Sequence, residues 1–471
     1  MTQPFPDDPF LKGFWAPFGA EVEAPDLVIE GDLPDCLNGT FYRNGPDPAF
    51  PPKDGNKYHV FDGDGMVYGL SLGDGKASLK NRWVRTPKLD QEQAAGRRLF
   101  GVFGNPAFND PGINPMDYNT GNTHIWPHAG KLYALMEGCP PIEMDKDSLS
   151  TVGPETYGGG VAGPFTAHPK TDAQTGEMFA FGWGAKGPGS TDVRYNIVDK
   201  DNNLTKTEWL HQPYCSMMHD FFMTENYVIF PCLPITIDLS RAMSGKPLTA
   251  WDDSKPAAFG VMPRYGSADD IKWFETDPTF MFHSGGAYEA DGKLHIEVGA
   301  TKRAPLMPSA DGSPVPQDNT KQRLTRWTMG TDGEATHYTE TVLGDLDMQF
   351  PRIDDRYMGR PYRYLYTNVA LGGESGRDDG FDGYARYDIS DGKSDIYAPP
   401  EKTVFGEGVF VPSAPESAQD DGYVLVFGWN KARNLSDLFI FSAQDISGGP
   451  VAKVNVPFRV PGGFHCNWMA A

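Results

Sequence analysis

Short apolar or alternating runs recur along the whole chain, and each is bounded by Gly, Asp or Pro. Such runs predict β-strands, because alternate side chains of a strand point to opposite faces and turn residues end the strand. The seven clearest runs lie at residues 66–70, 132–136, 178–183, 227–230, 294–298, 362–366 and 423–427. Their spacing of roughly 45 to 70 residues is close to, though looser than, the blade length of β-propellers.

Helix signals are few by comparison. Residues 91–98 predict one short helix, residues 310–316 predict an exposed loop, and no long stretch has the apolar period of an amphipathic helix. No shift of composition marks a domain boundary. We therefore predict a single all-β domain over residues 1–471, a closed β-propeller. Blades arranged around an axis bring residues that are far apart in the sequence close together.

Composition narrows the class of protein further. The 54 Gly and 41 Pro suit a turn-dense β-protein, and the net charge of −22 argues against nucleic acid or anionic lipid as a partner. We interpret this charge as a solubilising surface. The five cysteines are odd in number and lack CxxC spacing, so we expect no disulfide framework and a cytoplasmic location. No apolar run approaches the roughly 20 residues of an integral membrane segment.

Four histidines stand in flanks rich in aromatic residues or Met: His168, His219, His283 and His465. Each histidine taken alone also fits a buried, hydrogen-bonded core residue. Imidazole is a ligand that suits Fe, Zn, Cu and Ni. If the four meet on a propeller axis, they form a site of neutral ligands. Such a site favours a redox-active iron over a hard ion such as calcium, which prefers oxygen ligands.

Several longer motifs connect these histidines with one family. They lie at residues 39–46, 58–66, 122–126, 350–354 and 463–465. In these segments, and nearly from end to end, the sequence resembles the carotenoid cleavage oxygenase family, within it the bacterial branch that contains the lignostilbene dioxygenases. The resemblance implies a seven-bladed propeller with a cap of loops and short helices over an axial Fe(II). It also implies that the same four histidines are the iron ligands.

Further site residues follow from the positions of the matching motifs. Family members orient three of the imidazoles with carboxylates, and Glu137 and Glu407 fall where two of those acids belong. The third position holds Gln349, whose amide can accept the same imidazole N–H without bringing a charge. Such an acceptor fixes the imidazole tautomer and raises ligand basicity. Thr123 matches a residue that narrows one open iron position, although an ordinary strand threonine is the alternative.

The resemblance also identifies candidate substrate contacts. Phe61 fits the position of an aromatic residue that stacks on the substrate ring. Phenol-cleaving relatives grip the substrate oxygen with a Lys and a Tyr, where this chain has Met136 and Phe103. Met and Phe form an apolar wall that accepts an aromatic ring or a polyene without a phenol anchor. A requirement for a 4-hydroxyl group on the substrate is therefore left open.

The function that these features imply is an Fe(II)-dependent dioxygenase of aromatic catabolism. Dioxygen is the co-substrate, and the enzyme cleaves the C=C bond of a stilbene-like, lignin-derived phenylpropanoid dimer into two aldehydes. Alternatives are an apocarotenoid-cleaving oxygenase, a propeller that binds a ligand without turnover, and a calcium-dependent propeller hydrolase. The histidine flanks do not supply the oxygen cage that the last would need. The partner is a small aromatic or polyene alkene, and a homodimer is left open.

Overall fold

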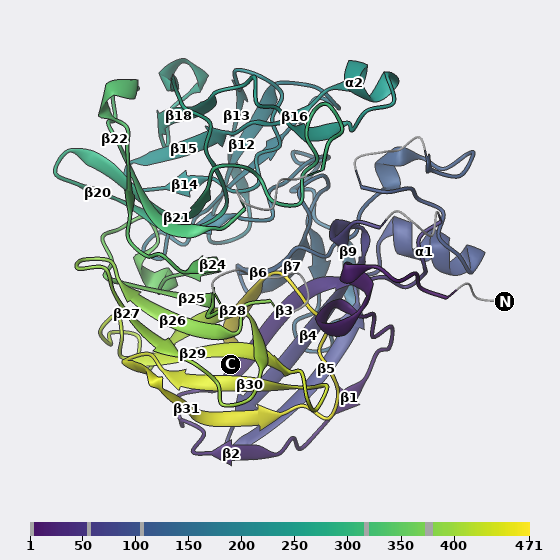
Figure 1. Ribbon diagram of the computed structural model, residues 1–471, viewed down its shortest axis with the longest axis vertical. Coiled ribbons are helices and arrows are strands. Elements are labelled where there is room, and N and C mark those ends of the chain that lie inside the picture. The colour runs from purple at the N-terminus through teal and green to yellow at the C-terminus, as the bar shows by residue number, and fades with distance from the viewer. Residues whose placement is uncertain (1–3, 54–57, 104–107, 315–319, 373–379) are drawn as a thin grey trace. The chain divides into compact units, whose positions relative to one another are not determined.

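β-Strands are the main regular secondary structure of the protein (Figure 1). A computed structural model describes residues 4–53, 58–103, 108–314, 320–372 and 380–471. Within them, seven sheets of four or five strands follow one another along the chain, together with one two-stranded sheet. This is the strand arrangement of a seven-bladed β-propeller, which is the fold class that the sequence predicts.

Five of the seven larger sheets contain only strands that are close in sequence. In the order in which neighbouring strands are hydrogen-bonded, these sheets are β6 (His124–His128), β7 (Lys131–Leu135), β8 (Ile142–Met144) and β9 (Thr151–Pro154); β10 (Lys170–Thr171), β11 (Met178–Trp183), β12 (Asp192–Val198) and β13 (Leu204–His211); β14 (Phe222–Met223), β15 (Tyr227–Cys232), β18 (Ala257–Pro263) and β19 (Lys272–Thr276); β20 (Phe280–Ala290), β21 (Lys293–Thr301), β22 (Arg323–Met329) and β23 (Thr339–Val342); β24 (Asp347–Arg352), β25 (Tyr364–Ala370), β26 (Gly383–Asp388) and β27 (Lys393–Tyr397).

The other two larger sheets combine strands from both ends of the chain. They are β1 (Glu23–Ala24), β5 (Lys76–Trp83), β4 (Asp64–Gly73), β3 (Gly39–Asp47) and β32 (Cys466–Ala470); and β2 (Ile29–Gly31), β31 (Asp445–Asn455), β30 (Leu435–Ser442), β29 (Gly422–Asn430) and β28 (Thr403–Pro412). The C-terminal strand β32 thus pairs antiparallel with β3, near the start of the chain (Figure 1).

Each of the seven predicted strand runs falls in a different one of these sheets. They correspond to β4, β7, β11, β15, β21, β25 and β29. The run at residues 362–366 starts two residues before β25, which begins at Tyr364. The period of the apolar pattern therefore predicted the number of blades correctly.

The predicted helix exists, but its predicted bounds were wrong. α1 spans Pro87–Ala95, where Thr86 accepts the Leu89 N–H through its hydroxyl oxygen at 3.2 Å and Pro87 occupies the first turn. Gly96 ends the helix with φ of 66°, a left-handed conformation that glycine adopts without strain. The prediction of residues 91–98 thus missed the first turn and ran past the end. α2 (Leu239–Met243) lies near the two-stranded sheet of β16 (Ile235–Ile237) and β17 (Thr249–Trp251).

Short 3-10 helices and loops make up most of the remaining chain. The 3-10 helices are η1 (Pro9–Leu11), η2 (Gly13–Trp15), η3 (Val60–Asp62), η5 (Pro115–Asp117), η6 (Ala268–Asp270), η8 (Ala335–His337) and η9 (Asp355–Tyr357). Of the predicted loop at residues 310–316, the part up to residue 314 forms a turn and an irregular stretch that is mostly exposed. Residues 315 and 316 lie outside the described residues.

The chain divides into two compact units. Unit 1 contains Met1–Thr156, Gly376–Ala385 and Asp395–Ala471, and unit 2 contains Tyr157–Ser375 and Arg386–Ser394. Each unit has its own apolar core: Phe41, Leu70 and Leu425 are among the buried residues of the first, and Phe181 and Phe230 among those of the second. The prediction of one domain over residues 1–471 stays a prediction.

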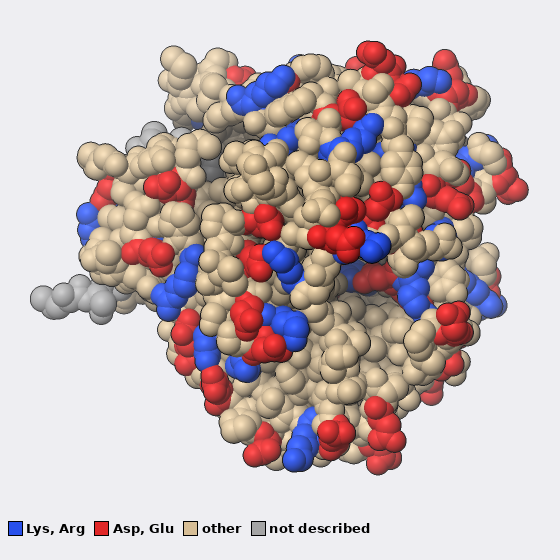
Figure 2. Space-filling model, turned by 180° about the vertical axis from the view of Figure 1, so that it is seen from behind, with Lys and Arg blue, Asp and Glu red and all other residues tan. Residues whose placement is uncertain are grey.

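The surface and the cysteines agree with the composition. On the face that Figure 2 displays, acidic and basic side chains are interspersed rather than gathered by sign. All five cysteines are free thiols, which confirms that the chain has no disulfide framework. None of the helices in the described part of the chain is both long and apolar enough to cross a membrane. A cytoplasmic location and a homodimer stay predictions.

Candidate metal centre

Three of the four predicted histidines come together in unit 2. His168 lies just before β10, His219 just before β14, and His283 within β20. The Nε2 atom of His219 is 3.0 Å from Nε2 of His168 and 3.1 Å from Nε2 of His283. The ligating nitrogens of the three lie within 4.8 Å of one another. Each imidazole is thus carried at or near the start of an edge strand, and the three ring edges converge.

The tautomer of His283 is fixed by Gln349 on the neighbouring strand β24. His283 Nδ1 is 2.8 Å from Gln349 Oε1. The same Oε1 accepts the backbone N–H of Phe350 at 3.2 Å, so this atom must be the amide oxygen. His283 Nδ1 therefore carries the proton and donates it, which leaves a lone pair on Nε2. Gln349 thus does in this geometry what a carboxylate would do, without adding a charge.

Breaks in strand register aim these side chains. The pairing of β20 with β21 shifts between Met281 and Ser284, on either side of His283. The pairing of β24 with β25 shifts between Gln349 and Arg352. In that segment Phe350 has φ of 56°, which is strained for a bulky residue, and its ring lies 4.9 Å from that of His283. Such β-bulges re-aim side chains beside functional sites.

The fourth histidine has a similar local environment in unit 1. His465 precedes β32, and its Nδ1 lies 3.0 Å from Glu407 Oε1. The other carboxylate oxygen of Glu407 accepts the backbone N–H of Cys466 at 2.6 Å. Glu407 also stands at a shift of register, between Phe405 and Gly408 of β28. Where Glu407 accepts through both oxygens, His465 donates from Nδ1 and has its lone pair on Nε2.

His124 lies beside this pair, and the sequence did not predict a role for it. Ligating atoms of His124, Glu407 and His465 lie within 4.8 Å of one another. However, Asn467 Nδ2 donates to the Ile125 carbonyl at 2.8 Å and to His124 Nε2 at 3.0 Å. Since His124 Nε2 accepts this hydrogen bond and its ring lies 4.7 Å from that of His465, His124 is better explained as a packing neighbour of His465 than as a ligand of a second metal. In the sequence, the only signal for this contact was an amide residue, Asn467, two positions after His465, which places both side chains on the same side of a strand.

The remaining predicted residues all lie in unit 1. Glu137 and Met136 follow β7, both half-buried, and the Met136 sulfur accepts the Gly138 N–H at 3.1 Å. Thr123 is also half-buried, and its hydroxyl donates to Asn122 Oδ1 at 3.1 Å. The roles assigned to Thr123 and Glu137 stay predictions.

Phe61 and Phe103 belong to one aromatic cluster. Their ring centroids are 5.3 Å apart, edge to face. His59 stacks on Phe103 at 5.1 Å and lies 4.6 Å from Phe61, and Phe464, next to His465, lies 5.8 Å from Phe61. Neither His59 nor Phe464 was expected in this cluster, although both stand in the family motifs. The cluster gives unit 1 a mainly aromatic wall directly beside His465.

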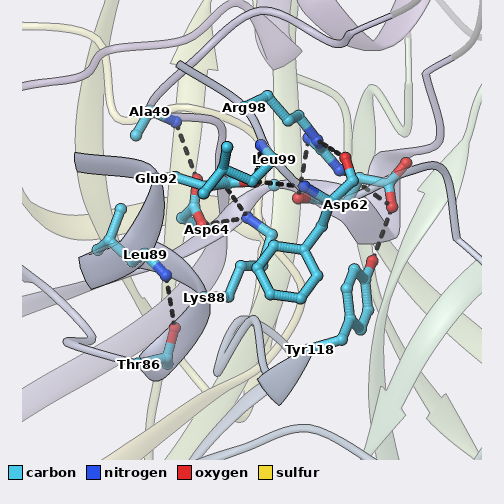
Figure 3. A network of polar contacts seen from close by, with 12 residues as sticks. Ala49, Asp62, Asp64, Thr86, Lys88, Leu89, Glu92, Arg98, Leu99 and Tyr118 are labelled. Carbon is cyan, nitrogen blue, oxygen red and sulfur yellow. Dashed lines mark hydrogen bonds and ion pairs between the residues drawn. The ribbon is translucent and has the colours of Figure 1, made fainter. Parts of the chain in front are cut away.

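A buried network of charged residues holds together the two chain segments that carry Phe61 and Phe103 (Figure 3). Arg98 donates to the carbonyl oxygens of Phe100 and Gly101 at 3.1 and 3.2 Å and pairs with Asp62 at 3.4 Å. Tyr118 donates to Asp62 at 2.7 Å. Burial, and next the charge of Asp62, hold the pKa of Tyr118 well above its usual value, so it stays a donor. Because Asp62 follows Phe61, the network connects Phe61 to the segment that ends in Phe103.

The second half of the network anchors α1 to the same segment. The fully buried Lys88 donates to Asp64 at 2.5 Å and to Glu92 at 3.0 Å. Glu92 in turn accepts the backbone N–H groups of Leu99 and Phe100 at 3.0 and 3.1 Å. Since both acids share the one ammonium group and backbone donors, these buried charges are paired and hydrogen-bonded.

The histidines stand at or near strand ends of a propeller, and His283 and His465 each have an oxygen partner at Nδ1, so the group could hold a metal ion. Comparison with known proteins defines the family. The family model described as retinal pigment epithelial membrane protein matches residues 15–470. The chain belongs to this family, the carotenoid cleavage oxygenases, and is an enzyme of the carotenoid cleavage oxygenase type.

Several named relatives match the chain over nearly its full length. It is 34% identical to the isoeugenol monooxygenase of Pseudomonas nitroreducens, with 98% of each chain covered. It is also 34% identical to lignostilbene-alpha,beta-dioxygenase isozyme III of Sphingomonas paucimobilis, covering 99% of this chain and 98% of the relative. The crystal structure of Pseudomonas brassicacearum lignostilbene dioxygenase matches with a TM-score of 0.95 and 35% identity over 100% of both chains. The predicted family and branch are thereby confirmed.

Proposed function

We propose that the protein is an Fe(II)-dependent oxygenase that cleaves the C=C bond of a stilbene-like phenylpropanoid into two aldehydes. His168, His219, His283 and His465 are the proposed ligands of the iron. The observation that carries the proposal is the convergence of three Nε2 atoms in unit 2, 3.0 and 3.1 Å apart. His465 completes the proposed set because its Nδ1 is held by Glu407 as His283 Nδ1 is held by Gln349.

The donor set fits a metal better than it fits hydrogen bonds alone. His283 Nε2 has a lone pair, and a neutral His219 Nε2 carries at most one proton, so it can donate to only one of its two neighbours. A cation would satisfy all three nitrogens. With metal–imidazole bonds of about 2.1 Å, ligands at right angles have nitrogens about 3.0 Å apart, and ligands at the tetrahedral angle about 3.4 Å. The observed spacing of 3.0 and 3.1 Å is short enough for one metal ion to bind all three nitrogens.

Iron bound there would supply the redox centre at which dioxygen reacts with the alkene. The chain's own residues bind and orient. Gln349 and Glu407 hold the imidazole protons on Nδ1 and so direct the Nε2 lone pairs inward. Cleavage of an alkene by one dioxygen molecule into two carbonyls balances in atoms and electrons. It therefore requires no nicotinamide or flavin reductant.

The aromatic wall around Phe61 and Phe103 supports an aromatic alkene as substrate. Ring centroids 5.3 Å apart in an edge-to-face arrangement offer an apolar surface for a further ring. The names of the relatives agree with this class, since they specify lignostilbene and isoeugenol. Met136 and Phe103 supply neither the ammonium nor the hydroxyl group that would hold a phenolate. We therefore propose that a 4-hydroxyl group contributes little to binding.

The test is a metal assay followed by a substrate screen. Purified protein is reconstituted with Fe(II), and the iron per chain is measured beside calcium and zinc. The iron-loaded protein is then incubated with stilbenes with and without a 4-hydroxyl group, isoeugenol and apocarotenoids, and aldehydes are quantified. We expect one iron per chain and aldehydes from stilbenes. Turnover of apocarotenoids alone would favour the second candidate, which the apolar wall also suits. Retention of calcium instead of iron would refute the proposal.

A further inference from the structure

A single buried carboxylate connects the three strands that carry the histidines of unit 2. Asp220 directly follows His219, and its Oδ1 forms an ion pair with Lys170 Nζ at 2.7 Å. Its Oδ2 accepts the backbone N–H of Ser284 at 3.1 Å and the Ser284 hydroxyl at 2.7 Å. Lys170 stands two residues after His168, and Ser284 directly follows His283. Each strand is thus held at a residue next to, or two from, its histidine.

The contact to Ser284 acts on the β-bulge that aims His283. Register in β20 shifts on both sides of Ser284. A bulge disturbs the ladder and leaves backbone groups in need of other partners. Asp220 accepts the Ser284 N–H and thereby fixes the backbone of the bulge. His283 is the residue immediately before Ser284, so the direction of its side chain depends on this bond.

Stability alone does not account for an ion pair at this place. Side-chain exposure is 9% for Lys170 and 1% for Asp220, and the pair is next to Phe221, part of the apolar core of unit 2. Replacing a buried ion pair by well-packed apolar residues is often neutral or stabilising, because desolvation of the charges is costly. A role in fixing one geometry agrees with the two hydrogen bonds that Asp220 accepts from Ser284.

We propose that Asp220 is a positioning residue that sets the mutual spacing of His168, His219 and His283 and thereby the affinity for the metal. The inference rests on the proposed function, in which these histidines are metal ligands. Lys170 and Ser284 are its partners in this role. The 3.0 and 3.1 Å spacings of the Nε2 atoms are, on this view, built into the protein before the metal arrives.

The test separates position from stability by removing both charges together. The double variant Asp220→Leu with Lys170→Met keeps a similar side-chain volume and leaves no buried charge unpaired. We measure affinity for Co(II) by competition with a chelator, the visible spectrum of bound Co(II), and the urea midpoint of the metal-free protein. Because Ser284 loses its acceptor, we expect a midpoint lowered only as far as in the control below, an altered Co(II) spectrum and an affinity about 10- to 100-fold lower, the usual cost of losing an outer-shell partner.

A matched control removes another buried ion pair of the same unit. Glu297 and Arg326 form such a pair on β21 and β22, and Glu297→Leu with Arg326→Met should leave Co(II) affinity unchanged. Ser284→Ala removes one hydrogen bond only, so it tests the inference even if the double variant does not fold. We expect it to lower the affinity about fivefold, which corresponds to a typical single hydrogen bond.

The outcomes distinguish this inference from the proposed function. If the unaltered protein binds no metal, the proposed function is wrong. It is also wrong if the His168→Ala variant binds metal as tightly as the unaltered protein. If it binds metal through the histidines and the double variant binds as tightly with the same spectrum, the positioning role of Asp220 is wrong. An equal loss of affinity in the Glu297 control would also overturn it, because the loss would then follow from removing any buried pair.

Discussion

Gln349 offers the sharpest test of how the histidines are held. Its Oε1 accepts the proton of His283 Nδ1 at 2.8 Å. In Gln349→Met the side chain keeps its length but loses the acceptor. The metal-bound state must keep the proton on Nδ1, where it would have no partner, whereas the metal-free state can move the proton to Nε2. The missing hydrogen bond therefore destabilises the metal-bound state and leaves the metal-free state nearly unchanged.

The expected magnitude follows from that asymmetry. A buried donor left without its acceptor costs about 1–3 kcal/mol, which corresponds to a metal affinity lower by about 5- to 150-fold. Gln349→Glu should have the opposite effect. A charge-assisted hydrogen bond is about 1 kcal/mol stronger than a neutral one, so the metal should bind about fivefold more tightly. The backbone N–H of Phe350 can be accepted in this variant as before.

The assay is Co(II) or Fe(II) binding in competition with a chelator, with the urea midpoint of the metal-free protein measured beside it. Gln322→Met is the matched control, because Gln322 is a buried glutamine of the same unit whose side-chain oxygen has no hydrogen-bond partner among the described residues. It should leave the affinity unchanged. If Gln349→Met binds metal as tightly as the unaltered protein, Gln349 does not hold the His283 tautomer.

The remaining predictions concern ligands, oxygen, specificity and thiols. His283→Ala and His465→Ala should each abolish turnover and lower the iron content, and full activity in either variant would remove that residue from the ligand set. With labelled dioxygen, each aldehyde should carry one labelled atom after correction for exchange with water; label in one product only, or dependence on NADH, would contradict a dioxygenase. Met136→Lys with Phe103→Tyr should raise the rate of 4-hydroxystilbene cleavage about 10- to 150-fold, as expected for a charged hydrogen bond made in the transition state. If the unaltered protein already cleaves these substrates as fast as its Lys-bearing relatives do, the argument from the missing phenol anchor is wrong. Iodoacetamide should modify Cys36 first, since it is the exposed cysteine, and mass spectrometry that finds another thiol modified equally fast would refute this.

Sequence reasoning reached the architecture because blade strands repeat a local signal. Each of the seven apolar runs needs only its own alternation and its bounding turn residues to be recognised, and each lies in a separate sheet. The predicted bounds of 91–98 differ from those of α1, whose ends are set by the local signals Thr86, Pro87 and Gly96. The candidate ligands came from motif flanks, which the resemblance supplied.

Other parts of the site depend on tertiary registration that no local pattern encodes. The direction of His283 depends on how β20 shifts against β21, and that of Glu407 on how β28 shifts against β29. The sequence does not distinguish Asp220 from any other acidic residue that follows a histidine. Only the folded structure shows that it accepts a hydrogen bond from Ser284. The motif assigned Gln349 to an imidazole, and in the structure Gln349 lies against His283. The atom that it presents to His283 could be determined only from the second hydrogen bond, to Phe350.

The pairing of the last strand with β3 has a consequence for how the protein is made. Register joins Arg43 to Cys466, so unit 1 cannot close its first sheet until the segment around Cys466 has left the ribosome. Contacts between residues this far apart in sequence are slow to form, because the entropy of closing so long a loop is lost before the contact contributes. Until then β3 exposes an unpaired edge, which invites aggregation. His465 arrives with that same strand, so the proposed metal ligand set stays incomplete until that strand has been made.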